Sequence, residues 1–174
     1  MTDGATHTYR TSLTWSGSTG VGYRLYDRAH ALRADGADPT LDLSSDPAFL
    51  GDPSRLNPEQ LLVAAASSCQ LLSFLAVAAR ARLDVVAYDD AAEAVMPEDD
   101  PPVRITRIDL RPRVVLADTG AARPTDDRLR HLAEVAHREC FIANSLASEV
   151  VVSPSFSWRD QASPTPGSDT ADGG

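Results

Sequence analysis

The sequence predicts an α+β protein in which an antiparallel sheet packs with two main helices. Two apolar runs, residues 57–82 and 127–147, have the length and residue spacing of helices. Segments in which apolar and polar residues alternate precede, separate and follow them. Strands in runs, interrupted by single helices, are typical of α+β folds and not of a wound parallel sheet. The expected order of elements is β-β-β-α-β-β-α-β.

The N-terminal part predicts three strands. Residues 7–16 alternate apolar and polar side chains, and residues 23–34 follow a glycine-rich turn at 17–22, so the two segments form a hairpin. A short third strand is expected near Leu41–Leu43. The loop that follows is rich in Asp, Pro and Gly.

The first helix begins at a clear start signal. Asn57 is a favoured N-cap residue, Pro58 suits the first helical position, and the carboxylate of Glu59 suits the positive end of the helix dipole. Cations near Arg80–Arg82 suit its C-terminus. Apolar residues surround the helix instead of forming a stripe, which predicts a core helix covered on most sides.

The second half predicts two strands, a helix and a last strand. The strands span residues 84–96 and 103–116, with a bulge or kink near Arg107–Ile108. Thr125 or Asp126 caps a helix over about 127–147, and the last strand covers 149–158. The side chains expected to line the core in the second of these strands are Val103, Ile105, Ile108, Leu110, Val114 and Leu116.

Length and composition predict one soluble domain. The chain has 174 residues, which favours a single domain over residues 1–158, followed by a disordered polar tail over 159–174. A net charge of -9 argues against a nucleic-acid partner, because phosphate binding needs a basic face. All 16 basic residues are Arg. The polar start lacks a signal peptide, so a cytoplasmic location is expected.

A membrane partner is not expected either. Residues 61–79 are the only stretch long and apolar enough to be considered, and they are dominated by Ala. Inserting their polar side chains into a bilayer would be unfavourable. These polar side chains are Ser67, Ser68, Gln70 and Ser73.

Cys69 and Cys140 carry the most information about function. Each lies late in an apolar helical run, and neither has a CxxC partner. A thiolate is a strong nucleophile that attacks peroxide bonds, so the two sulfurs would form a redox couple if the fold brings them together. The alternative is that both are small core residues, because free cysteine is among the most buried residue types.

Other chemistry is weakly supported. Glu59 precedes Cys69 by ten residues, about 15 Å of helical rise, so the two cannot meet within one straight helix. Glu59 either reaches a shared site from a partner subunit or through an intermediate residue, or it only complements the helix dipole. No metal is expected, because His131 and His137 lack the spacing that puts two ligands on one helix face.

The helix start and its cysteine resemble the hallmark of a known family. Asn57-Pro58-Glu59-Gln60-Leu61-Leu62, then Ala64–Ala66 and Ser68-Cys69, is similar to the element shared by OsmC/Ohr proteins, the osmotically induced and organic hydroperoxide resistance proteins. A second cysteine late in the second helix and followed by a last strand, here Cys140, also resembles the family. The similarity covers residues 9 to 158.

The resemblance implies a fold, a mechanism and partners. Curved sheets would wrap the two helices in an intertwined homodimer. The activity would be a thiol peroxidase that needs no metal, haem or other cofactor, with a small hydroperoxide as substrate and an external dithiol as reductant. Cys69 would be the peroxidatic thiolate and Cys140 the resolving thiol. Glu59 would orient an arginine that keeps Cys69 ionised, since a carboxylate holds a guanidinium by paired hydrogen bonds.

The chain departs from the family at two places. The usual cysteine-proline pair is Cys140-Phe141 here, which puts the disulfide geometry in doubt. The arginine does not align without gaps. Arg28 is the first choice, Arg55 the second and Arg24 the third; the alternative for Arg28 is an exposed strand residue paired with Asp27.

The sequence therefore predicts a peroxidase that reduces organic hydroperoxides to alcohols in oxidative-stress defence. Apolar neighbours of the cysteines favour a fatty or aryl hydroperoxide over hydrogen peroxide; they are Leu72, Phe74, Phe141 and Ile142. One alternative is a non-catalytic, stress-associated dimer of the same fold that binds a small molecule. Another is an acyl-binding or thioesterase-like protein, although no carboxylate and water site is evident.

Overall fold

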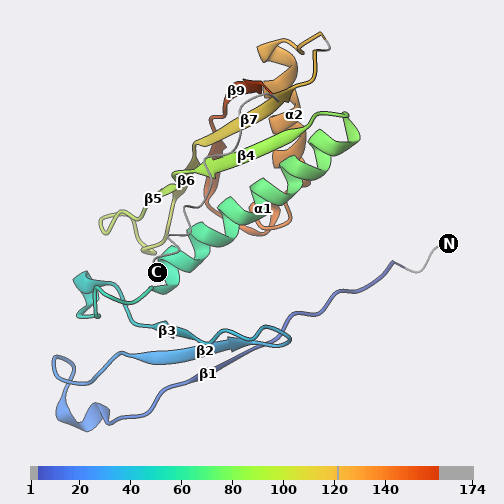
Figure 1. Cartoon of the computed structure of the whole chain (residues 1–174). Coiled ribbons are helices and arrows are strands. Elements are labelled where there is room, and N and C mark those ends of the chain that lie inside the picture. The colour runs from blue at the N-terminus through green and yellow to red at the C-terminus, as the bar shows by residue number, and fades with distance from the viewer. Residues whose placement is uncertain (1–3, 121, 161–174) are drawn as a thin grey trace, which may run out of the picture. The chain divides into compact units, whose positions relative to one another are not determined.

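The computed structural model describes residues 4–120 and 122–160 (Figure 1). The chain divides into two compact units, residues 1–62 and residues 63–174, and each is described by itself. The single domain expected over 1–158 stays a prediction. The tail expected over 159–174 lies outside the described residues from 161 onward, whereas Arg159 and Asp160 belong to the last strand.

The first unit holds a three-stranded antiparallel sheet. Its strands are β1 (Thr11–Thr14), β2 (His30–Ala34) and β3 (Leu41–Leu43), in the order β1-β2-β3. The hairpin is confirmed, but both of its strands are shorter than expected. Residues 23–26 form a turn because the carbonyl oxygen of Gly22 accepts hydrogen bonds from the N–H groups of Leu25 and Tyr26. Trp15 Nε1, which precedes the loop, donates a hydrogen bond to the carbonyl oxygen of Asp27, which follows it, at 2.7 Å.

Helix α1 (Pro58–Arg80) begins where the sequence predicts. Asn57 Oδ1 accepts a hydrogen bond from the N–H of Gln60 at 2.8 Å, and Gln60 Oε1 accepts one from the N–H of Asn57 at 3.0 Å. This reciprocal pair is a capping box. The helix ends as Arg82 adopts a left-handed φ of 60° and the N–H of Leu83 bonds back to the carbonyl oxygen of Ala78.

The second unit contains two three-stranded sheets with the orders β4-β7-β9 and β5-β6-β8. In each, the strand that follows the second helix pairs in parallel with its neighbour, so the sheets are mixed and not purely antiparallel. The expected α+β class of two main helices with curved sheets is confirmed. The strands are β4 (Val85–Asp90), β5 (Glu93–Val95), β6 (Arg107–Leu110), β7 (Pro112–Asp118), β8 (Glu149–Val152) and β9 (Ser155–Asp160).

Each of the three strands expected in this unit is split into two consecutive strands: β4 and β5, β6 and β7, and β8 and β9. The carboxylate of Asp90 explains two of the interruptions, because it accepts hydrogen bonds from the N–H of Arg111 at 2.7 Å and from Ser67 Oγ at 2.5 Å. Pro154 lies between β8 and β9 and has no N–H to give to a ladder. The irregularity expected near Arg107–Ile108 is therefore at Arg111.

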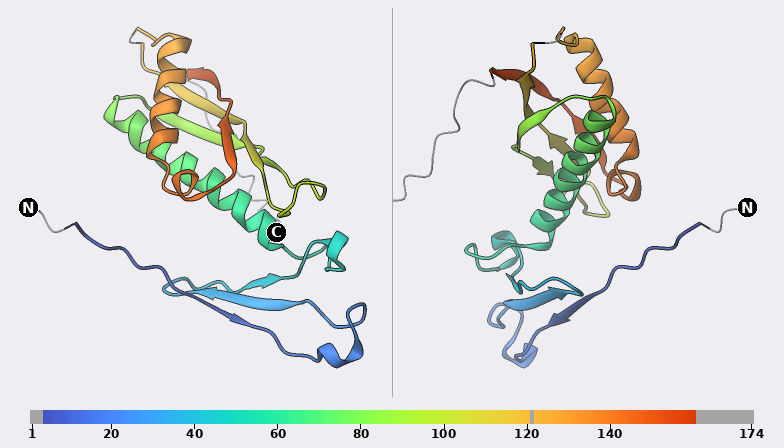
Figure 2. Two further views of the ribbon diagram at one scale, coloured as in Figure 1. Left: turned by 180° about the vertical axis from the view of Figure 1, so that it is seen from behind. Right: turned by 45° about the vertical axis from the view of Figure 1, so that its right-hand side comes forward.

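The core of the second unit lies between α1, the second helix α2 (Asp126–Glu139) and one face of the sheet β4-β7-β9. Val114 and Leu116 of β7 point to the same face as their partners Phe156 and Trp158 on β9, and both helices contact that face (Figure 2). The expected core residues of β6, β7 and the segment before them are buried: Ile105, Ile108, Leu110, Val114 and Leu116. Val103 is exposed, which corrects that prediction.

The prediction that α1 is covered on most sides is wrong. Its buried residues form one stripe, Ala66, Gln70, Phe74, Val77 and Ala78. Leu72 and Leu75 on another side are exposed. By length and composition alone α1 also resembles a membrane span, as do core helices of soluble proteins.

Helix α2 (Asp126–Glu139) is shorter than expected. Thr125 Oγ1 caps its start by accepting from the N–H of Arg128. The predicted end at 147 is wrong because polar side chains capture the carbonyl groups that would continue the helix. Asn144 Nδ2 donates to the carbonyl oxygen of Arg138 at 3.0 Å, and Ser145 Oγ donates to that of Phe141 at 2.7 Å. Cys140 is consequently the C-cap residue and not part of the helix.

The capping box predicts a measurable contribution to stability. Asn57→Ala removes the acceptor for the N–H of Gln60 and the donor to Asp46 Oδ2, and is expected to lower the free energy of unfolding by about 1–2 kcal/mol. Asn57→Ser keeps an oxygen acceptor at the N-cap and should retain most of that free energy. Urea denaturation measures both, and equal losses would contradict the capping role.

Candidate active site

The two cysteines, far apart in the sequence, meet in the second unit where the middle of α1 passes the end of α2. The N–H of Ile142 lies 3.5 Å from Cys69 Sγ, and the N–H of Ala143 lies 3.4 Å from Cys140 Sγ. Both residues are free thiols. Cys69 is half-buried, whereas Cys140 is 1% exposed. The pair therefore combines a thiol that a small reagent can reach with one that it cannot.

A side-chain contact between the two helices lies beside the thiols. Gln70, the residue after Cys69, is buried and donates from Nε2 to the carbonyl oxygen of Ala133 on α2 at 3.4 Å. Ala133 and Ala136 of α2 share one buried cluster with Phe74, Val77 and Ala78 of α1, so both helices contribute to the same core. Gln70 could have been singled out in the sequence as a polar residue in an apolar run, but its role there was not predicted.

The surroundings keep Cys140 protonated. Burial is the main cause that raises the pKa of Cys140 to about 11, and a hydrogen bond with the Cys69 thiol raises it further. The backbone N–H groups of Ala143 and Ile142 act in the opposite direction. The N–H groups of two consecutive residues, Ile142 and Ala143, contact one sulfur each, which places the two thiols at the same turn. At neutral pH Cys140 is a neutral thiol.

Tyr88 on β4 packs against Phe74 of α1, and its buried hydroxyl is a polar group that sequence reasoning missed. Its hydroxyl is buried and makes no hydrogen bond to any described residue. Burial raises the pKa of Tyr88, and the negative charge of Asp90 raises it further, so this hydroxyl stays protonated. Nothing in the sequence distinguishes Tyr88 from an ordinary core aromatic residue on an alternating strand.

Glu59 lies in the first turn of α1 and belongs to the first unit. Its Oε2 atom is buried and accepts no hydrogen bond within residues 4–120 and 122–160. A buried carboxylate oxygen without a partner is costly, because burial removes the water that would stabilise its charge. Glu59 is thus suited to receive a cation or a hydrogen-bond donor.

Arg28, the first-choice arginine, lines a pocket of about 300 Å³ in the first unit together with Tyr23, Tyr26 and His30. Its guanidinium donates to the carbonyl oxygens of Tyr26 at 2.9 Å and Tyr23 at 2.7 Å, and it lies 4.0 Å and 5.0 Å from the centres of their rings. The alternative pairing with Asp27 is wrong, because the carboxylate of Asp27 accepts from the N–H of Ala29. No described carboxylate pairs with Arg28.

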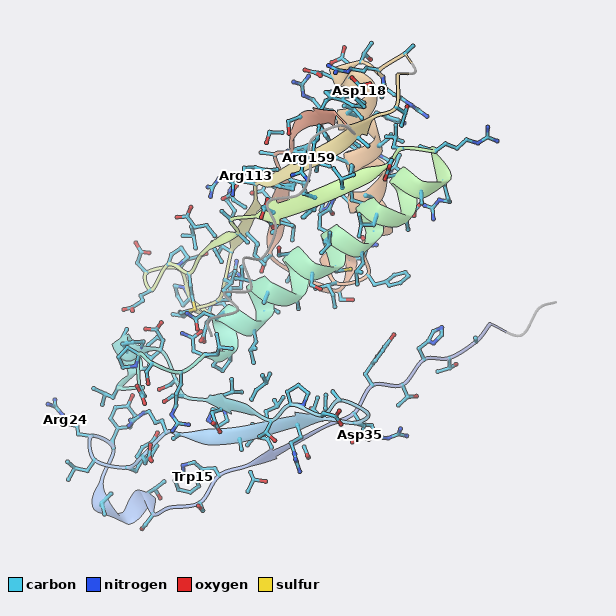
Figure 3. The ribbon with its side chains drawn as sticks, in the orientation of Figure 1. Trp15, Arg24, Asp35, Arg113, Asp118 and Arg159 are labelled. Carbon is cyan, nitrogen blue, oxygen red and sulfur yellow. The ribbon has the colours of Figure 1, made fainter. Side chains whose placement is uncertain are left out.

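The other two arginines are placed less favourably. Arg55 forms ion pairs with Asp52 at 3.4 Å and Asp42 at 3.9 Å, so its charge is already partnered. The side chain of Arg24 extends away from the strands of its unit (Figure 3). Arg28 and Cys69 lie in different units, so which arginine serves Cys69 stays a prediction.

The apolar side chains expected near the cysteines differ in exposure. Phe74 was expected to line the substrate's approach, but it is 1% exposed and packs against Tyr88 and Phe156 in the core. Leu72 and Phe141 are exposed, at 63% and 81%. Within the described part of the chain, no group of three or more His, Cys, Asp or Glu side chains is placed to hold a metal ion.

A pair of free thiols at one turn of an α+β fold is the arrangement expected of a protein with a two-cysteine redox site. The model of the family called OsmC-like protein matches residues 51–155. A solved OsmC-like protein of unknown function from Vibrio cholerae is 32% identical, with a TM-score of 0.77, over 86% of this chain and 100% of that one. The chain therefore belongs to the OsmC-like family. No curated protein sequence matches the chain significantly.

Two more distant structures share the fold. The organic hydroperoxide resistance protein OsmC of Legionella pneumophila is 18% identical, with a TM-score of 0.63, over 88% of this chain and 99% of that one. An organic hydroperoxide resistance protein of Elizabethkingia anophelis is 16% identical, with a TM-score of 0.65, over 89% and 99%. At these identities the similarity establishes the fold alone.

The raised pKa of Cys140 predicts a loss of stability in alkaline solution. Below about pH 9 the thiol is protonated in both folded and unfolded chains; between about pH 9 and 11 only the unfolded chain releases the proton, which favours unfolding. The free energy of unfolding should fall by about 2 kcal/mol over this range. Urea denaturation with a reductant present measures it. Cys140→Ser should lose this component, and an identical pH dependence in both proteins would contradict the assignment.

Proposed function

We propose that this protein is a cysteine-based peroxidase that reduces organic hydroperoxides to alcohols. The observation that carries the proposal is the placement of Cys69 and Cys140 at one turn, where consecutive backbone N–H groups contact their sulfurs, one thiol being half-buried and the other buried. Membership in the OsmC-like family supports the same conclusion. A cytoplasmic location, where dithiol reductants are available, is part of the proposal.

The proposed reaction has three balanced steps. The thiolate of Cys69 attacks the terminal peroxide oxygen, a sulfur–oxygen bond forms, the oxygen–oxygen bond breaks, and the alkoxide leaves as an alcohol after taking a proton. Cys140 then attacks the sulfenic acid of Cys69, a disulfide forms, and water leaves. An external dithiol supplies two electrons and two protons by thiol–disulfide exchange and restores both thiols. No metal or other cofactor takes part.

The proposed activating groups come from a second copy of the chain. Arg28 would stabilise the Cys69 thiolate and the departing oxygen, and Glu59 would hold that guanidinium by paired hydrogen bonds. Two features support these roles: the charge of Arg28 has no described carboxylate partner, and the buried Oε2 of Glu59 accepts no described hydrogen bond. The exposed apolar side chains of Leu72, Leu75 and Phe141 support a homodimer, since exposed apolar patches mark interaction surfaces.

The proposed substrate is a fatty or aryl hydroperoxide. Leu72 and Phe141 expose apolar surface, which would attract an apolar chain or ring to the site. Hydrogen peroxide has no such group and gains nothing from these contacts. Equal catalytic efficiency with cumene hydroperoxide and hydrogen peroxide would contradict this preference.

A second candidate function is binding of a small molecule without turnover. The pocket of about 300 Å³ around Arg28, lined by two tyrosine rings, favours it, because aromatic rings and a cation together suit a small anionic or aromatic ligand. Under this reading both thiols survive exposure to hydroperoxide.

Thiol titration separates the two functions. With one equivalent of cumene hydroperoxide, the wild-type protein should lose both free thiols and gain one disulfide. Cys69→Ser should consume no hydroperoxide, because the attacking sulfur is gone. Cys140→Ser should consume one equivalent and then stop, since the sulfenic acid is not resolved. Retention of both thiols in the wild-type protein would favour the binding function.

The role of Arg28 has a matched control. Arg28→Gln should lower kcat/KM for cumene hydroperoxide by about 100-fold or more, because it removes the positive charge at the developing oxyanion. Arg24→Gln removes a charge only a few residues away, from a side chain that points away from its strands, and should change kcat/KM less than twofold. Steady-state kinetics with a dithiol reductant measures both. Equal effects of the two substitutions would contradict the assignment.

A further inference from the structure

Two backbone N–H groups in succession point at the two sulfur atoms of the site. The N–H of Ile142 lies 3.5 Å from Cys69 Sγ, and that of Ala143 lies 3.4 Å from Cys140 Sγ. Neither N–H donates to a backbone carbonyl oxygen among the described residues. In a continuing helix both would be bonded to carbonyl groups one turn earlier. The early end of α2 is what leaves them available.

The turn itself is held firmly by other groups. The N–H groups of Asn144 and Ser145 bond to the carbonyl oxygens of Cys140 and Ile142, at 3.1 Å and 2.9 Å. The side chain of Asn144 adds a bond to the carbonyl oxygen of Arg138. These contacts fix the peptide planes of the turn without using the N–H groups of residues 142 and 143, so the direction of both donors is built into the backbone.

Successive backbone N–H groups in a turn form a concavity that favours anions. A thiolate is such an anion, and it accepts hydrogen bonds more strongly than a neutral thiol does. The donors in this turn therefore interact more strongly with the ionised sulfur than with the protonated one. This holds whether or not a guanidinium also reaches Cys69.

The residue after Cys140 bears on this arrangement. Cys140 has φ -73° and ψ 109°, close to the extended conformation that a following proline would impose. Phe141 in place of proline thus leaves the backbone at Cys140 nearly as a proline would set it. A proline at 142, in contrast, would remove the donor to Cys69, while the φ of -68° at Ile142 already matches the angle that proline requires.

We infer that the turn of residues 140–143 is a thiolate cradle in which the backbone N–H of Ile142 stabilises the ionised sulfur of Cys69 and that of Ala143 stabilises the ionised sulfur of Cys140. The two N–H groups do not touch the substrate; they contact the sulfurs and so position and stabilise them. The inference rests on the proposed function for its biological meaning, since it supplies the thiolate stabilisation that the peroxidase reaction needs.

The test measures reactivity of Cys69 without any hydroperoxide. In a Cys140→Ser background, so that Cys69 is the only thiol, Ile142→Pro is expected to slow alkylation by iodoacetamide at pH 7 about five- to tenfold, because it removes the donor. The thiolate absorbance at 240 nm should fall in parallel. Ile142→Ala loses the side chain but keeps the N–H, so its alkylation rate should stay within twofold of the parent.

The control for ring strain is an ester at position 142, because it lacks the N–H that faces Cys69 but carries no ring. If Ile142→Pro does not fold, replacing Ile142 by its α-hydroxy acid converts the amide to an ester and removes only the N–H. The same five- to tenfold loss is then expected.

The experiment can contradict the thiolate cradle and the proposed peroxidase function independently of each other. Equal alkylation rates in the ester variant and the parent would overturn the cradle, even if the wild-type protein reduces hydroperoxides. A slowed rate in the ester variant, retained in the alanine variant, supports the cradle even if the wild-type protein consumes no hydroperoxide. In that second case the peroxidase proposal fails and the cradle stands.

Discussion

The end of helix α2 at Glu139 is the constraint on which the candidate site depends. If the helix continued to residue 147, Cys140 would lie inside it and the N–H groups of residues 142 and 143 would be bonded within the helix. Asn144 and Ser145 prevent this by bonding to the carbonyl oxygens of Arg138, in the last turn, and of Phe141, just beyond the helix. The chain turns at Cys140, the sulfur of Cys140 meets that of Cys69, and two backbone donors face the pair.

The rest of the second unit holds this turn in place. Gln70, beside Cys69, bonds across to α2, and fully buried alanines on both helices let them pack closely against the sheet β4-β7-β9. Asp90 ties Ser67 of α1 to the interruption between β6 and β7. The register of α1 against the sheet is thereby fixed within a turn of Cys69. The two thiols differ in burial: Cys69 is partly accessible, whereas Cys140 is enclosed and protonated.

Much of this follows from the sequence and some does not. Asn57-Pro58-Glu59 marks the start of α1 because capping depends on neighbouring residues, and the alternation of β6 and β7 marks their buried face. The end of α2 was missed because the apolar residues Phe141 and Ile142 continue the helical pattern, while the hydrogen bonds of Asn144 and Ser145 depend on geometry. Parallel pairing of β8 and β9 is a long-range choice that no local pattern encodes. The family element around Cys69 pointed to the thiol pair, whereas Tyr88 and the backbone donors carried no signal.

The candidate site requires that the sulfurs of Cys69 and Cys140 can form a bond inside one chain. Peptide mapping by mass spectrometry, after brief treatment with one equivalent of hydroperoxide, measures whether they do. We expect a single linked peptide pair containing Cys69 and Cys140, on a chain that keeps monomer mobility in a non-reducing gel. A disulfide between two chains, or oxidation of Cys69 to sulfinic acid with Cys140 still free, would contradict it.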